Sequence, residues 1–484
     1  MLSADEQNCL LEENRNMSSE YSLNSRQLLI VENHLNNSSK MKTYLFCLCL
    51  SLCNAADAVE IMCVGYIMSD LSNLSSINKE LLSSSVFIGM LLGGIIIGYL
   101  SDKYGRKPCL LLSLGLNSFA GSLSGFSINI NMLIILRLIS GIGIGASVPI
   151  VFSLGAEVFP TSIRGKLLSI IASFWMIGAL YVATSAWIML GIPSIYCGWR
   201  IFAVICAIPA IVAFIMVYYY LPESPKFLIN NGRNEEAITV LLYMSNNNLL
   251  LSSTYNILQS NEVEFSDLLV SNKNDDGTVN SDNAVNNFVD TIKLLAGPNL
   301  FYSTTLPLLI IWFTLSFGSY GISTWISVLY EDLGISNPYR DDFIYALANL
   351  PGNIISILFI EKYGRKKLLC YGMLLAAFSS LGFGLVSSNI SIVIGCAAAF
   401  NCFSVIGWNS LDCISCESFP TTIRATAMGI LASSGRFGAI FAQFVNGTLE
   451  SNISLLLFVT AGCMIVGGLG SVFLKNDNAG EVLY

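Results

Sequence analysis

The chain has 484 residues, of which 54% are hydrophobic and 12% are charged, and its mean hydropathy is +0.65. A soluble globular protein carries about 25% charged residues, so water is not the main solvent of this chain. The net charge is −8, and no basic surface favours nucleic acid. His34, the single histidine, lies in a polar amino-terminal segment, which excludes a histidine metal site and a histidine-based catalytic triad.

Apolar runs of about twenty residues, the length that crosses a bilayer, follow one another along the chain. They are expected at 43–68, 81–100, 108–128, 131–154, 168–190 and 200–221, and then at 304–329, 342–360, 367–387, 389–412, 424–445 and 453–474. The predicted fold class is therefore all-α: a polytopic membrane protein with about twelve transmembrane helices in two six-helix repeats.

This pattern predicts five segments. They are a disordered cytosolic amino-terminal tail (1–42), an amino-terminal six-helix bundle (43–221), a cytosolic middle loop with one or two short helices (222–303), a carboxy-terminal six-helix bundle (304–474) and a cytosolic carboxy-terminal tail (475–484). The orientation follows from Lys and Arg, which gather in alternate short loops, as they do on the cytoplasmic side of membranes. Both termini are accordingly expected in the cytosol.

Two short motifs occur once in each half. Asp102-Lys-Tyr-Gly-Arg-Lys107 returns as Glu361-Lys-Tyr-Gly-Arg-Lys366, and Glu157-Val-Phe-Pro-Thr-Ser-Ile-Arg164 returns as Glu417-Ser-Phe-Pro-Thr-Thr-Ile-Arg424. Both copies keep nearly the same displacement along the chain, which indicates an internal repeat. Two such repeats, related by an axis along the membrane normal, are expected to enclose a cavity at their interface.

The motifs resemble those of the major facilitator superfamily, over about residues 43–474. Gly98-Tyr-Leu-Ser-Asp-Lys-Tyr-Gly-Arg-Lys107 matches its loop between spans two and three, Arg137-Leu-Ile-Ser-Gly-Ile-Gly-Ile-Gly145 resembles its span-four signature, and Pro222-Glu-Ser-Pro-Lys-Phe227 resembles its sugar and organic-ion branch. The resemblance implies the major facilitator fold and a transporter.

A narrower resemblance is to the synaptic vesicle glycoprotein 2 family and its smaller relatives. It is carried by Ala56–Glu60, Gly145–Phe152, Phe174–Gly178, Leu350–Asn353 and Trp408–Asp412. Only a short loop joins spans seven and eight, where the vesicle glycoproteins have a large luminal insert, so the smaller relatives are more similar. This resemblance implies a plasma-membrane or intracellular vesicle-membrane location and does not supply a substrate.

Charged side chains inside the expected spans mark the candidate binding site, because each costs about 2.5–3.5 kcal/mol to insert at a helix centre. One tryptophan, Trp408, lies near Asp412 and is expected to stack on a sugar ring or cover a cation. The candidate substrate and coupling-ion residues are therefore Asp57, Glu60, Arg137, Trp408, Asp412 and Arg436.

Asp57 and Glu60 are spaced three residues apart, which places them on one helix face. In one interpretation this pair faces the cavity, where it binds a cationic group or takes up a proton. In the alternative, both carboxylates are permanently paired with Arg137 or Arg436 and never titrate. The sequence leaves both interpretations open.

The repeated loop motifs supply candidate gating residues. They are Asp102, Arg106, Glu157, Arg164, Glu361, Arg365, Glu417 and Arg424. Their ion pairs are expected to hold the two halves together on the cytosolic side when the cavity opens outward, and to separate when it opens inward. The second copy of the motif has Ile357 where the first opens with Gly98, which predicts a looser helix contact there.

Gly141, Gly143 and Gly145 superficially match a phosphate-binding loop. They lie within a span and no strand precedes them, so close packing against neighbouring helices is expected instead. No cofactor is expected. An enzyme is not indicated either, because no metal-ligand cluster and no nucleophile with a base appears in the sequence.

The combined interpretation is a secondary active transporter that moves a small organic solute by alternating access, with protons as the coupling ion. The expected partners are that solute, the lipid bilayer and protons. Two alternatives stay open. One is an organic cation/anion or sugar transporter, a symporter of a neighbouring branch. The other is a transporter-shaped vesicle membrane protein that no longer transports and serves as a binding or trafficking partner.

Overall fold

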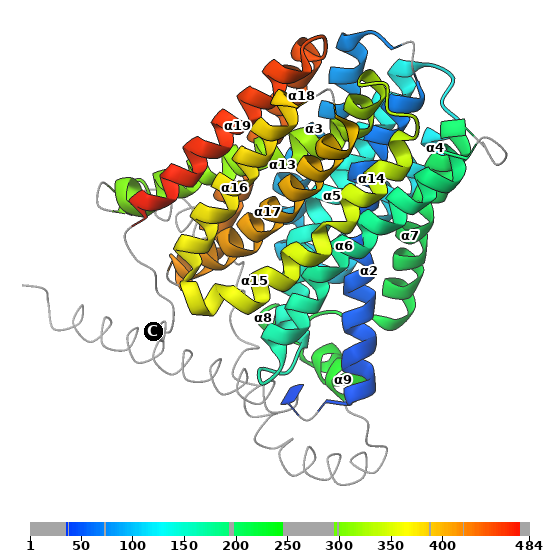
Figure 1. Cartoon of the computed structure of the whole chain (residues 1–484). Coiled ribbons are helices and arrows are strands. Elements are labelled where there is room, and N and C mark those ends of the chain that lie inside the picture. Colours follow the sequence, from blue (N-terminus) through cyan, green and yellow to red (C-terminus); the bar gives the residue numbers. More distant parts are fainter. Residues whose placement is uncertain are drawn as a thin grey trace, which may run out of the picture.

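Long apolar helices make up most of the structure, as the composition predicts (Figure 1). The computed structural model describes residues 35–36, 38–71, 74–192, 198–244, 295–297, 300–386, 389–419 and 421–474. Most of the expected amino-terminal tail, most of the middle loop and the carboxy-terminal tail lie outside the described residues.

The described residues of the first half include six long helices and two short ones. The long helices are α2 (Lys40–Asp70), α3 (Ser76–Tyr104), α4 (Arg106–Ser124), α5 (Ile130–Val158), α6 (Arg164–Met189) and α7 (Gly198–Tyr220), and the short ones are α8 (Pro225–Asn230) and α9 (Asn234–Met244). Asn129 caps α5 by accepting the Met132 N–H at 2.8 Å. The two short helices are those expected in the middle loop.

The second half repeats this arrangement. A π-helical turn (Phe301–Thr305) leads into α13 (Leu306–Asp332), and α14 (Pro338–Leu347), α15 (Asn349–Tyr363), α16 (Arg365–Leu385), α17 (Ile390–Glu417), α18 (Thr421–Leu449), α19 (Ile453–Gly470) and a 3-10 turn (Ser471–Phe473) follow. In Figure 1 these helices lie beside those of the first half rather than in a separate layer.

In the described part of the chain, eleven helical segments are long and apolar enough to cross a bilayer. The twelfth expected span is α4, which has 19 residues and is more polar than the others. It turns Asn117 inward, where the amide oxygen accepts the Ser140 hydroxyl of α5 at 2.8 Å. The amide oxygen of Asn117 therefore finds its partner inside the protein. With its long apolar helices, the chain is a polytopic all-α membrane protein.

The expected span at 342–360 is broken into α14 and α15 at Ala348. Two buried asparagines bond the carbonyls of the last turn of α14: Asn349 donates to Ala346 at 2.8 Å, and Asn401 of α17 donates to Tyr345 at 2.6 Å. Side-chain amides thus add hydrogen bonds to the carbonyls at the break, where the bilayer core supplies no water to bond them.

Glycines let α5 approach α3 and α4 closely. A Cβ atom added at Gly141 would lie 2.2 Å from the Val86 oxygen, and one at Gly145 would lie 2.0 Å from the Met90 oxygen, both on the backbone of α3. The expectation of close packing is confirmed. Gly98 of α3 has no such neighbour within 4 Å, and the looser helix contact expected at Ile357 stays a prediction.

The largest contacts between the described helices of the two halves are those of α2 with α13, α3 with α18 and α6 with α14, and α6 also contacts α15. The hydrogen bonds between described residues of the two halves lie at one end of the bundle, here called the Asp70 end, where α2 finishes. Ser69 donates to Glu331 at 2.8 Å, and Ser76 donates to Glu450 at 3.0 Å. Lys79 forms an ion pair with the same Glu450. The opposite end, where α4 begins at Arg106, is called the Arg106 end.

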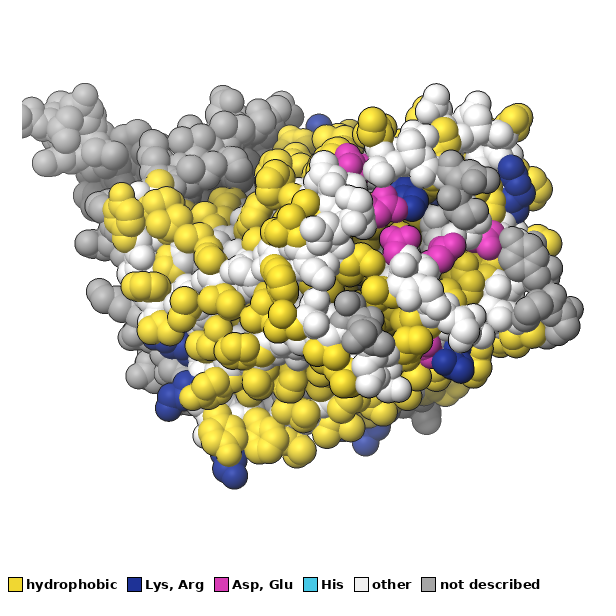
Figure 2. Space-filling model, turned by 45° about the horizontal axis from the view of Figure 1, so that its top comes forward, with side chains coloured by type: hydrophobic (Ala, Val, Ile, Leu, Met, Phe, Trp, Pro, Cys, Tyr) yellow, Lys and Arg dark blue, Asp and Glu magenta, His cyan; other side chains and the backbone are white. Residues whose placement is uncertain are grey.

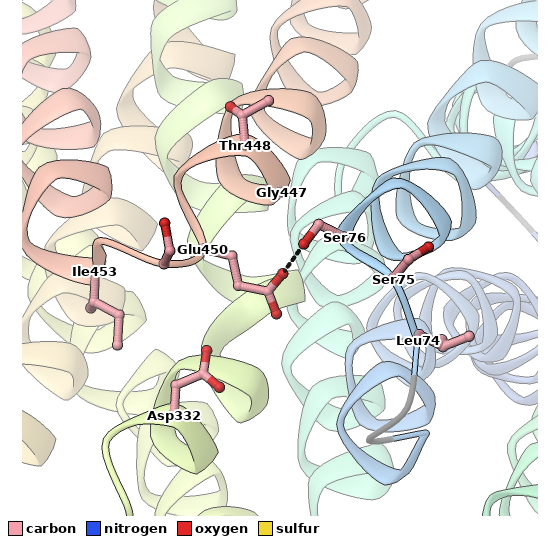
Figure 3. A pocket seen from close by; sticks show the side chains of 9 residues that line it. Leu74, Ser75, Ser76, Asp332, Gly447, Thr448, Glu450 and Ile453 are labelled. Atoms are coloured by element: carbon pink, nitrogen blue, oxygen red, sulfur yellow. Dashed lines mark hydrogen bonds between the residues drawn. The ribbon is translucent and has the colours of Figure 1, made fainter.

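Acidic side chains gather on the face at the Asp70 end (Figure 2). A hollow of about 520 Å³ opens there between the halves, with Ser76 on one side and Asp332 and Glu450 on the other (Figure 3). The buried apolar residues form one large cluster that runs through both halves and a second cluster that is confined to the first half. The halves are joined at the Asp70 end.

Gly145→Ala is expected to destabilise the protein, because its Cβ would overlap a backbone atom that cannot swing away like a flexible side chain. Overpacking of this kind costs about 1–3 kcal/mol. The measurement is the thermal unfolding midpoint of purified protein in detergent. Gly98→Ala is the matched control, since its Cβ meets nothing within 4 Å. Equal midpoints for the two variants would contradict the packing assignment.

Candidate functional site

The structure gives the two acids of α2 different surroundings. Glu60 is buried inside the first half, where its Oε2 lies 2.6 Å from Nη1 of Arg137 on α5. Both side chains are fully buried, and the same Arg137 nitrogen lies 3.0 Å from the Cys63 sulfur. A Cβ added at Gly121 of α4 would lie 2.4 Å from Glu60 Oε1, so α4 closes the site. The contact between Glu60 and Arg137 is therefore the permanent ion pair that the second interpretation of the acidic pair expects.

Asp57 lies one turn earlier and is also fully buried, but it is not in an ion pair among the described residues. The hydroxyl of Ser147 on α5 donates to its Oδ2, while Oδ1 has no hydrogen-bond partner in the described part of the protein. The positive charge of Arg436, on α18 of the other half, acts on this carboxyl across the interface. Asp57 therefore connects the two halves electrostatically.

An aromatic cluster lies beside Arg436. Its guanidinium carbon is 5.9 Å from the ring centre of Tyr320 on α13, and Tyr320 is 5.8 Å from Trp408 of α17. The ring centre of Tyr320 is also 5.3 Å from that of Phe87 on α3, which belongs to the first half. The Trp408 indole donates to Ser319 at 3.0 Å, which holds its ring in place.

Asp412 lies four residues after Trp408 and therefore on the same face of α17, toward α13. Its side chain is exposed, unlike that of Asp57. Trp312 of α13 packs edge-on against Trp408 at 5.5 Å and donates to Ser415. The candidate residues Trp408 and Arg436 are thus brought together around Tyr320, with Asp412 one turn beyond Trp408 on α17, whereas Glu60 and Arg137 are enclosed in the first half.

The candidate gating residues form the same ion pair in each repeat. Arg106 lies 3.5 Å from Glu157 and 3.1 Å from Asp102, and its counterpart Arg365 binds Glu417. Each of these pairs joins helices of one half. In this structure, whose halves are joined at the Asp70 end, each motif finds a partner inside its own repeat. Ion pairs between the halves at the Arg106 end stay a prediction for the opposite conformation.

Arg164 donates to the Phe159 carbonyl at 3.4 Å, and its Nε has no described partner. The side chains of the remaining two candidates, Glu361 and Arg424, lie outside the described residues.

Glu223, which lies just before α8, is a functional candidate that the sequence analysis missed. Its carboxylate accepts the backbone N–H groups of Arg106 and Lys107 at 3.0 and 3.2 Å, and so caps the start of α4. Burial raises the pKa of Glu223, although these N–H bonds act in the opposite direction. A helix start favours a nearby negative charge, and the first turn of α4 contains no acidic residue of its own. This lack was the signal in the sequence that an acid from another segment caps α4.

Comparison with solved structures shows the fold. The chain superimposes on the xylose transporter XylE from E. coli in its inward-open conformation with a TM-score of 0.69, covering 91% of this chain and 98% of that one at 20% identity. A partially occluded inward-open structure of XylE gives a TM-score of 0.67 at 19% identity. At these identities the likeness shows the fold, which is that of a polytopic major facilitator protein.

The sequence comparisons are more specific. The chain belongs to the family described as Sugar (and other) transporter, which matches residues 21–476. It is 26% identical to synaptic vesicle glycoprotein 2C of Mus musculus, over 90% of this chain and 78% of that protein, and 26% identical to synaptic vesicle glycoprotein 2B of Homo sapiens, over 87% and 81%. Family membership places the chain among membrane transporters rather than enzymes.

Glu60→Gln is expected to destabilise the protein strongly, because it leaves Arg137 charged and unpaired in a fully buried site. Breaking such a pair costs about 3–5 kcal/mol. The double variant with Arg137→Met removes both charges and should be more stable than the Glu60→Gln single variant. Equilibrium unfolding in mixed micelles measures this difference.

The control is Glu236→Gln, which breaks the exposed ion pair with Arg233 on the surface of α9. It is expected to leave stability unchanged. If the double variant Glu60→Gln/Arg137→Met is less stable than Glu60→Gln alone, the unpaired charge of Arg137 is not the cause of the destabilisation, and the prediction is wrong.

Proposed function

We propose that this protein is a secondary active transporter that moves a small organic solute by alternating access and couples its movement to protons through Asp57. The observation that carries the proposal is the surroundings of Asp57. Its carboxyl is fully buried, one of its oxygens is unpartnered among the described residues, and it interacts with Arg436 of the opposite half.

This arrangement is suited to proton coupling because a buried carboxylate without a close cation is costly, so protonation and ion pairing compete to neutralise it. Movement of the two halves changes the separation between Asp57 and Arg436, since one residue is on α2 and the other on α18. The proton affinity of Asp57 therefore depends on the conformation. Glu60 is not given this role, because Arg137 neutralises it within a single half.

The solute is proposed to bind beside Asp57, at the group formed by Tyr320, Trp408, Asp412 and Arg436. The aromatic rings offer flat faces for an organic solute, and the charged groups offer both signs, which favours a polar or zwitterionic molecule. A sugar is the second candidate. It is supported by the family description and by the xylose transporters that share the fold.

Alternating access is supported by the contacts at the Asp70 end, where the described hydrogen bonds between the halves occur. If Lys and Arg mark the cytosolic side, this end faces outward and the structure has its outer side closed. Both termini then lie in the cytosol, in a plasma or intracellular vesicle membrane. The second copy of each gating pair matches the first, so each half is proposed to move as one unit.

The test is uptake by purified protein in liposomes under an imposed pH gradient, with cationic, zwitterionic and sugar solutes screened in parallel. Asp57→Asn removes the titratable group while keeping its shape, so proton-driven accumulation should fall to the level of protein-free liposomes. Exchange of the same solute across the membrane without a gradient should persist, because exchange does not need a net proton movement.

Asp57→Glu, which restores a carboxyl, is expected to recover part of the accumulation, and Glu236→Gln on the surface of α9 should behave as the unmodified protein. Accumulation that survives in Asp57→Asn would reject Asp57 as the coupling residue. If no solute moves although the protein is folded, the non-transporting binding or trafficking partner becomes the better account of this chain.

A further inference from the structure

Two buried aspartates begin α14 at the Asp70 end, outside the site described above. Asp341 is 0% and Asp342 is 3% exposed. Their partners differ. Asp341 accepts a hydrogen bond from Arg340 at 2.8 Å, so a cation neutralises it. Asp342 accepts from the Ser327 hydroxyl at 2.7 Å and is hydrogen-bonded by the hydroxyl of Tyr66, and both of these partners are neutral.

Asp342 lies where the halves touch. Tyr66 belongs to α2 of the first half, whereas Ser327 and Asp342 belong to α13 and α14 of the second. The Tyr66 ring is 4% exposed and packs against Phe202 at 5.7 Å and Tyr339 at 6.3 Å. Closing the Asp70 end is therefore what brings Tyr66 onto Asp342 and removes its carboxyl from water.

The groups around Asp342 do not supply a second cation. The titratable and charged groups that face it or its partners are Tyr66 of α2, Cys206 of α7, Tyr330 of α13, and Tyr339, Arg340, Asp341 and Tyr345 of α14. The other packed elements present neutral groups, Trp187 of α6 against Phe343 and the Asn401 amide of α17 on the Tyr345 carbonyl. Of these described groups Arg340 is the cation, and it bonds Asp341.

A charged carboxylate in this position would be buried with two neutral donors, which offset only part of the cost of removing it from water. A protonated carboxyl carries no charge and still accepts the Ser327 hydrogen bond. When the halves separate at this end, Tyr66 leaves and water reaches the group, which removes the penalty on the ionised form. The two conformations therefore differ in how many protons they hold.

We propose that Asp342 binds a proton each time the Asp70 end closes and releases it when that end opens, a second proton-coupled position apart from Asp57. This inference rests on the alternating access of the proposed function. The proton comes from and returns to the water at the Asp70 end. Because the closed form holds one more proton, the ratio of closed to open molecules rises by up to tenfold for each unit of falling pH.

The test measures the opening of the Asp70 end directly. Spin labels are attached through non-canonical amino acids at Ser75 and Ser451, exposed residues of the two halves that line the hollow of Figure 3. Distances between the labels are recorded in nanodiscs from pH 5 to pH 9 by pulsed electron paramagnetic resonance. The short, closed distance is expected to dominate at acidic pH and the longer one to grow as pH rises.

Asp342→Asn has nearly the same shape without a titratable group, and its amide oxygen accepts from one hydroxyl while its NH2 group donates to the other, so the short distance should persist at every pH. Asp341→Asn is the matched control and should keep the pH response, because its partner is Arg340. Glu450→Gln, which breaks the ion pair with Lys79, should favour opening at every pH without removing the response. Tyr66→Phe removes a donor to the ionised form, so the transition should move to higher pH.

An unmodified protein whose distances do not depend on pH would overturn the proposal, and so would a full pH response in Asp342→Asn. If Asp342→Asn fails to fold, the Tyr66→Phe variant provides the test. A pH transition of the label distance that does not move to higher pH in Tyr66→Phe would then reject the proposal. The measurement needs no solute. A negative uptake screen together with a pH-dependent distance would therefore reject solute transport while leaving the role of Asp342 intact.

Discussion

A charge that a membrane span buries must find its partner inside the protein, because the bilayer core offers no water. This constraint explains three different arrangements on neighbouring helices. Glu60 is neutralised by Arg137 at 2.6 Å within one half. Asp57 has a hydroxyl partner and a cation across the interface. Asp342 has two hydroxyl partners among the described residues, one of them from the opposite half. The surroundings of Glu60 lie within one half and do not change when the halves move, whereas those of Asp57 and Asp342 depend on how the halves are placed.

The close packing of α3 and α5 makes these arrangements possible. Glycines on both helices bring their backbones together, and α5 carries both Arg137 and Ser147, the partners of the two acids on α2. A helix that is held rigidly supplies both partners at fixed positions. The first half therefore presents Asp57 to α18 as part of one packed unit.

The same logic is repeated at the Arg106 end. Gly105 and Gly364 adopt positive φ angles of 112° and 83° at equivalent points of the two repeats, and each lets one helix end and the next begin at once. Arg106 and Arg365 then pair with Glu157 and Glu417 inside their own halves. These contacts stiffen each half, while the contacts at the Asp70 end join the halves to each other. The two ends of the bundle thus have different functions.

Much of the architecture was predictable from the sequence, because the length of an apolar run and the positions of its polar breaks depend on the bilayer and not on the neighbours of a helix. The helix positions, the internal repeat, the packing glycines and the family follow from local patterns. The break at Ala348 has a local signal in Pro351, which has no N–H to donate to the Leu347 carbonyl. The bond from the Asn401 amide to the Tyr345 carbonyl was not predictable, since Asn401 comes from a distant helix. Asp342 escaped notice because it lies at the expected edge of a span, where an acid is ordinary.

The sequence by itself therefore determined which residues cross the membrane and which charged side chains cross with them. Only the tertiary structure decided their partners. Asp57 and Glu60 are three residues apart and looked equivalent, yet Arg137 reaches Glu60 alone and Arg436 acts on Asp57 from the other half. Spacing along a helix defines the direction of a side chain, but the charge that it meets there is set by how separate helices pack, which no local pattern records.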